Sequence, residues 1–336
     1  MTAIYGVWRF TGGDVGADFR RMDLALARFG EDDHQTFAAA PGLAMGRHLH
    51  RSLPEDLFRS PEIEGQRYTV VGDVRLTERD DLARQLRLGG EAKQMSDSTI
   101  AALAIERWGE AAFDRIYGDF AIAAWDRKEQ RLLLARDHLG HKPLFFHRGG
   151  GLIAFASMPV GIQALPDVPL GPDLDSMKRF LALWPQSPGK TYYEGIERVM
   201  PGHYAVVTCD DITKVRYWNP DLTPLRLPTS QHYADAMAEH LDRAVAAALR
   251  GSERVVAAHL SSGMDSTAVA TTAARLLAAS GGTVVAYTAA PREDYDKALP
   301  GRLMDESTLA KEAERYATLS QNNIKQIQNE QVKTTN

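Results

Sequence analysis

Residues 259–270, HLSSGMDSTAVA, combine residue types that could hold a phosphate group. An apolar run leads into a Ser/Gly turn, an acid follows, and an alanine-rich helix is predicted to begin near Ser266. Successive backbone N–H groups in such a turn bind anions, and the N-terminus of the next helix adds positive charge. The hydroxyls of Ser261 and Ser266 can donate to phosphate oxygens, while Asp265 can bind Mg²⁺ through oxygen.

Spacing alone leaves an alternative open for this turn. It is not a Walker loop, because no lysine follows Gly263. The same residue types, however, would also form an ordinary capped turn that binds no ligand.

Histidines and the cysteine elsewhere suggest no second centre of chemistry. His48 and His50 would share one face of a strand, but no third metal ligand lies close to them in the sequence. We therefore expect no metal site there. Cys209 has Lys214 as its one basic neighbour, so an activated thiolate is not expected.

Length and composition fit a globular protein of about two domains. The chain has 336 residues, of which 44% are hydrophobic and 25% charged. A net charge of −5 without a dense Lys/Arg block makes nucleic acid and anionic membranes unexpected partners. The single cysteine excludes an internal disulfide and suits a reducing compartment. Because no export signal and no apolar run of roughly 18 residues is visible, we expect a cytoplasmic location.

The first 218 residues predict mixed α and β structure with many short strands. Helical periodicity covers 96–109, with Asp97 or Ser98 as the N-cap, and 174–184. Strand patterns, several of them paired as hairpins, cover residues 66–74, 119–137, 143–147, 152–157 and 203–218.

The composition changes after residue 218. Residues 219–230 contain three prolines and little periodicity, so we interpret them as a linker. Residues 231–317 then predict helix, strand, the Ser/Gly turn, helix and strand, with Val-rich strands typical of a parallel sheet buried on both faces. The Gln- and Asn-rich residues 318–336 predict a disordered tail that does not extend this sheet.

The turn LSSGMDS (260–266) resembles the pyrophosphate-binding loop of the asparagine synthetase family, in which two glycines usually follow the first serine. That family activates a carboxylate with ATP, releases pyrophosphate and lets an amine attack the acyl-adenylate. The resemblance implies ATP and Mg²⁺, with Asp265 as the metal contact. If the position of Ser262 needs a positive φ, the cost is on the order of 1–2 kcal/mol. The implied ATP and pyrophosphate contacts are Leu260, Ser261, Ser262, Gly263, Asp265, Ser266 and Tyr287.

The resemblance extends to the N-terminal part of the chain. Residues 117–146 are similar to the long hairpin of the family's glutaminase domain, and 192–207 resemble the passage that leaves it. This implies an αββα sandwich of the N-terminal nucleophile (Ntn) hydrolase type over residues 1–218. A partial α/β synthetase domain with a parallel sheet, of the adenine nucleotide alpha hydrolase type, follows. In the family, RDHLGHKP (136–143) connects a hairpin, so we interpret it as structural.

The chain departs from the family at its glutaminase residues. Members that hydrolyse glutamine begin Met-Cys-Gly, with the cysteine as nucleophile, whereas this chain begins Met1-Thr2-Ala3. In the family, the asparagine side chain of an Asn-Gly-Glu motif helps to stabilise the oxyanion, and the matching residues here are Val71-Gly72-Asp73. Loss of one such donor typically lowers the rate roughly 10²–10³-fold. Asp97, which matches the acid that holds the amine of glutamine, persists. We expect a structural remnant, with Thr2 catalytic only if glutaminase activity is retained.

Members of the wider family without the cysteine take the amine from their substrate, and lasso-peptide cyclases are one such group. Residues 286–295 and 305–316 resemble these cyclases more than asparagine synthetases. The implied substrate is a precursor peptide, or else a small carboxylate, and a peptidase of the same pathway is a candidate partner. Arg292 and Glu293 are candidate peptide contacts, with a solvated loop as the alternative.

Two other functions stay open: a glutamine-dependent asparagine synthetase that uses Thr2, and a non-catalytic peptide-binding subunit. Synthetase domains of the family continue through a second Gly/acid-rich turn, a catalytic acid and a lysine. We find no similarity to these after Tyr316. The sequence therefore predicts a truncated or frameshifted reading frame and a ligase that is inactive in this form.

Overall fold

The chain divides into two compact units, Met1–Leu222 and Thr223–Asn336. Their boundary lies inside the predicted linker 219–230. The computed structural model describes residues 1–58, 65–252, 254–289 and 325–327.

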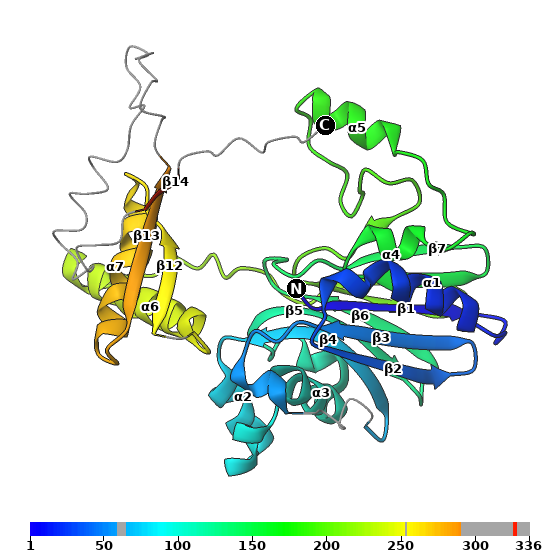
Figure 1. Cartoon of the computed structure of the whole chain (residues 1–336), viewed down its shortest axis with the longest axis horizontal. Helices are drawn as coiled ribbons and strands as arrows, with labels where there is room; N and C mark the ends of the chain where they lie inside the picture. Colours follow the sequence, from blue (N-terminus) through cyan, green and yellow to red (C-terminus); the bar gives the residue numbers. More distant parts are fainter. Residues whose placement is uncertain (59–64, 253, 290–324, 328–336) are drawn as a thin grey trace. The chain divides into compact units, whose positions relative to one another are not determined.

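The first unit contains two antiparallel sheets (Figure 1). In spatial order, the strands of one sheet are β2 (Asp33–Ala40), β3 (Leu43–Leu49), β1 (Ala3–Arg9), β8 (Leu152–Ala156), β7 (Phe145–Gly149) and β9 (Glu197–Arg198). Those of the other are β11 (Ile212–Arg216), β10 (His203–Val207), β6 (Arg131–Arg136), β5 (Gly118–Asp126) and β4 (Tyr68–Leu76). Strands β1 and β3 contact β4 across the interface between the sheets.

Helices cover the outer faces of both sheets. Helices α1 (Gly16–Leu26) and α4 (Pro159–Gln163) pack on the sheet of β1, and α3 (Asp97–Trp108) packs on β4 beside α2 (Arg79–Leu86). These four layers are the predicted αββα sandwich, which is confirmed. The remaining helices of the described part of this unit are α5 (Leu174–Leu181) and the 3-10 helices η1 (Ala27–Phe29), η2 (Pro54–Leu57), η4 (Gly90–Gln94) and η5 (Gly109–Ala112).

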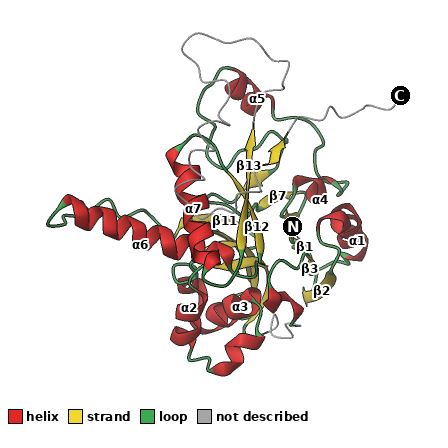
Figure 2. Cartoon of the chain, turned by 60° about the vertical axis from the view of Figure 1, so that its left-hand side comes forward, coloured by secondary structure: helices red, strands yellow, loops and turns green. Residues whose placement is uncertain are grey.

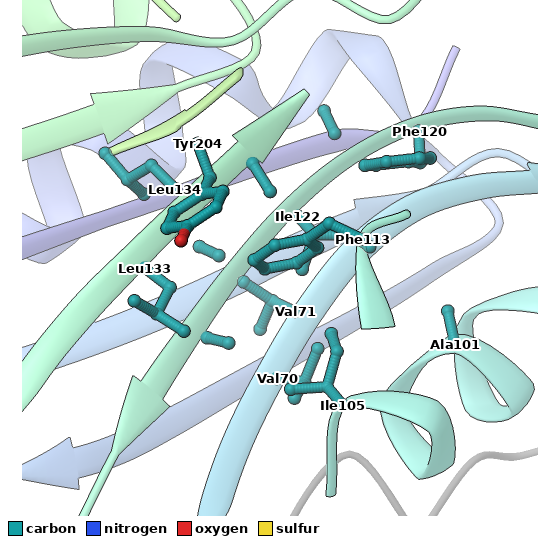
Figure 3. Close-up of a cluster of buried hydrophobic side chains, with 14 of the residues drawn as sticks. Val70, Val71, Ala101, Ile105, Phe113, Phe120, Ile122, Leu133, Leu134 and Tyr204 are labelled. Carbon is teal, nitrogen blue, oxygen red and sulfur yellow. The ribbon is translucent and has the colours of Figure 1, made fainter. Parts of the chain in front are cut away.

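The central strands β1 and β5 are apolar without alternation because both of their faces are buried, whereas the edge strand β2 alternates between half-buried and exposed residues. On β1, Ile4 and Trp8 belong to the core between the sheets, whereas Tyr5 and Val7 pack in a second cluster with Met22 of α1. Figure 3 shows part of the larger cluster, with side chains of α3 beside those of β4, β5 and β6.

Two helix ends differ from the sequence prediction. The N-cap of α3 is Ser96, whose Oγ accepts from the Thr99 backbone at 3.2 Å, rather than Asp97 or Ser98. Helix α5 ends at Leu181 instead of residue 184, because the chain turns at Leu183 with a φ of +55°. Local polar groups and single backbone angles set these ends, and apolar periodicity does not detect them.

The second unit contains a parallel sheet with helices on one side (Figure 2). Helices α6 and α7 contact each other, and Val245 of α6 and Leu277 of α7 pack with Val284 of the sheet. Its elements in chain order are α6 (Ser230–Leu249), β12 (Val255–His259), α7 (Met264–Ala278), β13 (Thr283–Ala289) and β14 (Lys325–Ile327).

Two expectations about this sheet are wrong. Residues 325–327, expected in a disordered tail, pair with β13 as a parallel strand, which needs backbone groups rather than apolar side chains. Burial on both faces was also expected. Val255 is 64% exposed, and β12 alternates between exposed and half-buried residues in the described part of the unit. Valine and alanine side chains allow a second layer to pack on a sheet face, but they do not show that such a layer is present.

Candidate functional site

The Ser/Gly turn lies at the carboxyl edge of the parallel sheet. His259 is opposite Tyr287 in the ladder of β12 and β13, and α7 begins five residues after His259, at Met264. Leu260 is fully buried and fixes the start of the turn: its N–H donates to the Tyr287 carbonyl at 2.9 Å, and its carbonyl accepts from Thr288 Oγ1 at 2.8 Å. The turn therefore starts from a rigid position, where parallel sheets gather ligands.

The two serines of the turn lie within hydrogen-bond distance of each other. Ser261 Oγ and Ser266 Oγ are 2.7 Å apart, and the Ser261 N–H donates to Ser266 Oγ at 3.1 Å. The N–H of Gly263 donates to Ser261 Oγ at 3.1 Å. Both hydroxyls are half-buried and adjoin the exposed Gly263, so one small anion could contact both.

The backbone of the turn is unstrained. Among the described residues, the non-glycine positions with positive φ are Arg87, Gln130 and Leu183, so Ser262 needs no left-handed conformation. Gly263 caps α7 with a φ of −77°. The energetic cost considered for Ser262 therefore does not arise in this conformation.

The electrostatics of the turn suit a phosphate bound together with a cation. Helix α7 has 15 residues, and the amides of its first turn have no carbonyl partner within the helix. These amides and the helix dipole favour an anion. Asp265 is exposed in this same turn, and Mg²⁺ is usually held by one or two carboxylates plus substrate phosphates. The donor set thus fits a magnesium–phosphate ligand.

The structure brings the predicted ATP contacts together at one sheet edge. Residues 260–266 form one continuous turn. Tyr287 is adjacent through the strand ladder, but its side chain is half-buried in the alternating pattern of β13, whose buried positions include Thr288. Sequence reasoning missed Thr288 as the anchor of the turn. Arg292 and Glu293 lie outside the described residues.

In the first unit, the hydroxyl of Thr2 already has two backbone partners. Thr2 is 6% exposed, and its Oγ1 accepts from the His50 N–H at 3.0 Å and lies 3.3 Å from the His50 carbonyl, to which it donates. Thr2 lines a small cavity with Gly72, Asp73 and Ser98. The hydroxyl is thus held in place by the backbone of the residue that follows β3.

Next to this small cavity lies a larger one of about 320 Å³ that the sequence did not indicate. Leu49 and Asp56 line both. Arg47 lines the larger cavity although it is 3% exposed, and its guanidinium donates to Gln35 Oε1 at 2.7 Å. Burial lowers the pKa of Arg47, whereas Asp56 and other acids oppose this. The available clue in the sequence was the arginine within the strand LAMGRHL (43–49).

The two acids near the expected glutaminase site, Asp97 and Asp73, form hydrogen bonds and ion pairs with neighbouring residues. Asp97 is fully buried, and its carboxylate accepts from the Leu76 N–H at 2.7 Å and from Arg79. Asp73 forms an ion pair with Lys142 at 2.9 Å; burial raises the pKa of Asp73, and Lys142 opposes that shift. Val71 is buried in the core. Both oxygens of Asp97 thus have partners within the fold, and its role in holding a ligand amine stays a prediction.

Comparison with known proteins gives two matches to protein families. Residues 1–218 match a glutamine amidotransferase domain and residues 236–333 match asparagine synthase. The second match continues beyond residue 317, where the sequence had suggested that similarity ends. Among the residues that the structure describes, no helix is long and apolar enough to cross a membrane.

Individual relatives are distant. The chain is 32% identical over 158 residues to glutamine-hydrolyzing asparagine synthetase 3 of Bacillus subtilis, which covers 46% of this chain and 26% of that protein. It is 27% identical over 203 residues to amidase chyE of Penicillium rubens, covering 59% and 29%. A glutamine phosphoribosylpyrophosphate amidotransferase structure from B. subtilis has a TM-score of 0.45 at 15% identity, covering 90% of this chain and 71% of that one.

The chain spans about a quarter of the length of these two curated relatives. The amidotransferase match nevertheless covers all the helices and strands of the four-layered unit, and the synthase match contains the turn at the sheet edge. Residues 236–333 are similar to asparagine synthase, and the chain belongs to the glutamine amidotransferase domain family, whose model matches residues 1–218.

Proposed function

We propose that this chain supplies the pyrophosphate-binding turn of an ATP-dependent ligase that forms amide bonds. The observation that supports this most directly is the geometry of residues 260–266. Two serine hydroxyls 2.7 Å apart, a glycine and the N-terminus of α7 lie together at the carboxyl edge of a parallel sheet. Phosphate groups bind at this kind of edge in unrelated α/β proteins.

In the proposed reaction, a carboxylate oxygen of the substrate attacks the α-phosphorus of ATP. The bond to the β-phosphate oxygen breaks, giving an acyl-adenylate and pyrophosphate. An amine then attacks the acyl carbon, with loss of a proton and release of AMP. Ser261, Ser266 and the first-turn amides of α7 would bind the pyrophosphate. Asp265 would hold Mg²⁺, which neutralises negative charge as the leaving group departs.

We propose further that the amine comes from the substrate and not from glutamine. The Thr2 hydroxyl is paired with the backbone of His50, Val71 has no polar group for an oxyanion, and Asp97 is paired with Arg79. A lasso-peptide macrolactam is the finer form of this proposal, with a peptide side-chain carboxylate joined to the peptide's N-terminal amine. Its support is the sequence similarity of 286–295 and 305–316, which lie largely outside the described residues.

Calorimetric titration of the full chain with magnesium pyrophosphate tests the role of the turn. Ser266→Ala removes one donor to a charged ligand, an interaction worth roughly 1.5–3 kcal/mol, so Kd should rise about tenfold or more. Ser252→Ala is the matched control. Ser252 follows the end of α6, outside the turn, and its hydroxyl donates to the Leu249 carbonyl. Equal affinity in Ser266→Ala and the unmodified chain would reject the proposed binding site.

The same preparations, incubated with glutamine, test the source of the amine. We expect no more glutamate from the unmodified chain than from Thr2→Ala. Glutamate release that Thr2→Ala abolishes would favour the glutamine-dependent alternative and would leave the pyrophosphate result unaffected.

A further inference from the structure

A histidine pair in the first unit lies outside both candidate sites. His34 of β2 is directly opposite His48 of β3 in the antiparallel ladder, with ring centroids 4.7 Å apart. Helix α1 contacts β3 and brings Asp23 to the pair. The sequence suggested His48 and His50 as a pair without a third ligand. In the structure, His48 instead lies beside Asp23 and His34.

The ligand atoms of these three side chains all lie within 4.8 Å of one another. Asp23 Oδ1 lies 2.9 Å from His34 Nε2 and 3.0 Å from His48 Nε2. Tyr5 donates its hydroxyl proton to that same oxygen and lies 3.1 Å from His34 Nε2. His48 Nε2 is also 3.1 Å from the backbone carbonyl of Asp23. A single carboxylate oxygen, with two lone pairs in the carboxylate plane, thus has three polar neighbours.

We propose that Asp23, His34 and His48 form a binding site for a divalent transition metal of the zinc class. Two imidazole nitrogens and one carboxylate oxygen are a donor set typical of zinc, whereas calcium and magnesium prefer oxygen alone. Metal–ligand bonds of roughly 2.1 Å at angles of roughly 90–110° place donor atoms about 3.0–3.4 Å apart. The observed 2.9 and 3.0 Å are close to that range.

Burial and access also suit such an ion. His48 is 8% and Asp23 24% exposed at the side chain, so the enclosing groups are well positioned by packing. His34 is 45% exposed and gives the ion a route from solvent. Tyr5 stacks on the ring of His48 at 5.3 Å and limits its rotation. The ion would link α1 to the β2–β3 hairpin.

The metal site would lie on the opposite face of β3 from the larger cavity. Successive strand residues point to opposite faces, and Arg47 and Leu49, on either side of His48, both line that cavity. Metal binding would therefore fix β3, which forms one wall of the cavity, although none of the three metal ligands lines that cavity.

A second cluster, of Asp119, Asp137 and His141, also brings three donor atoms together in the described residues. We prefer the first, because the carboxylate of Asp137 accepts from four backbone amides, two at each oxygen, and therefore has its acceptor sites filled. Those bonds fix a turn and occupy the lone pairs that a metal would need. This cluster supplies a matched control, His141→Ala.

Zinc titration of the EDTA-treated full chain tests the proposal by calorimetry and by the zinc-dependent rise in the midpoint of thermal unfolding. We expect one zinc per chain in the unmodified protein and in His141→Ala. His34→Ala and Asp23→Asn should bind at least tenfold more weakly and should lose the thermal shift. His34 is partly exposed, so His34→Ala is expected to fold, which tryptophan fluorescence checks.

Three outcomes would overturn the proposal. One is the absence of zinc binding by the unmodified chain, which would leave the cluster as a proton-bonded network. Another is equal affinity in His34→Ala and the unmodified chain. Loss of binding in His141→Ala alone would assign the ion to the second cluster.

Discussion

At the scale of residues, the buried ion pair of Asp126 and Arg67 in the first unit predicts a pH dependence of stability. Asp126 is fully buried and accepts from Arg67 Nε at 2.9 Å and from a second guanidinium nitrogen of Arg67 at 2.7 Å. Burial would raise the pKa of Asp126, but hydrogen bonds from Arg67 and from the Glu129 backbone lower it to about 2. The folded state therefore favours the ionised carboxylate.

Because the folded pKa is below the unfolded value of about 3.9, this pair stabilises the protein above pH 4 and loses its effect as the pH falls toward 2. Asp126→Asn should lower the free energy of unfolding by about 2 kcal/mol at pH 7, and the difference should shrink between pH 5 and 2. Urea titrations followed by fluorescence measure this, because all five tryptophans lie within Met1–Leu222. The control is Asp175→Asn, at an exposed pair with Arg179, which should change the free energy of unfolding little. If Asp126→Asn destabilised the protein as much at pH 2 as at pH 7, the pKa assignment would be wrong.

At the scale of elements, two strands of the first unit approach each other so closely that one position requires glycine. Strand β5 begins at Gly118, which has a φ of +152°, and a Cβ there would lie 2.2 Å from the Arg75 carbonyl oxygen on β4. The backbone, unlike the end of a flexible side chain, has little freedom to move. Glycine is thus required for the start of the β4–β5 pairing.

Gly118→Ala should destabilise the first unit by roughly 3 kcal/mol or more, through backbone strain and the clash together. The measurement is the midpoint of urea unfolding by tryptophan fluorescence. Gly90→Ala is the matched control, since an added Cβ there meets nothing within 4 Å. Similar midpoints for the two variants would mean that β5 can start in another conformation.

At the scale of the whole molecule, the chain consists of two compact units joined by a segment without helix or strand between β11 and α6. Arg226 is exposed in that segment, four residues after Leu222. Brief trypsin treatment should therefore cleave after Arg226 and leave a fragment of residues 1–226 with native tryptophan fluorescence. Mass spectrometry identifies the fragment, and Arg226→Gln should slow its appearance. A fragment with unfolded-type fluorescence would show that the first unit needs the second.

The sequence alone predicted several hairpins of the first unit and the order of α6, β12, α7 and β13 in the second, and it singled out the Ser/Gly turn, but it did not predict β1, β2, α1 or α2. Apolar runs located the hairpins at 119–137 and 203–218, and the Ser/Gly turn before an alanine-rich helix located the candidate phosphate site. These features are local: a strand, a tight turn or a helix start depends on residues a few positions apart, so their pattern is visible in a single stretch of chain.

The tertiary structure alone decided which distant side chains meet. The sequence placed His48 with His50, yet strand register puts His34 opposite His48, and α1 brings Asp23 to both. Thr288 fixes the turn through Leu260, and Arg47 reaches a cavity that no motif marked. Partners of this kind depend on sheet register and packing across tens of residues, and one-residue shifts would exchange the faces of a strand. Local patterns contain no such information.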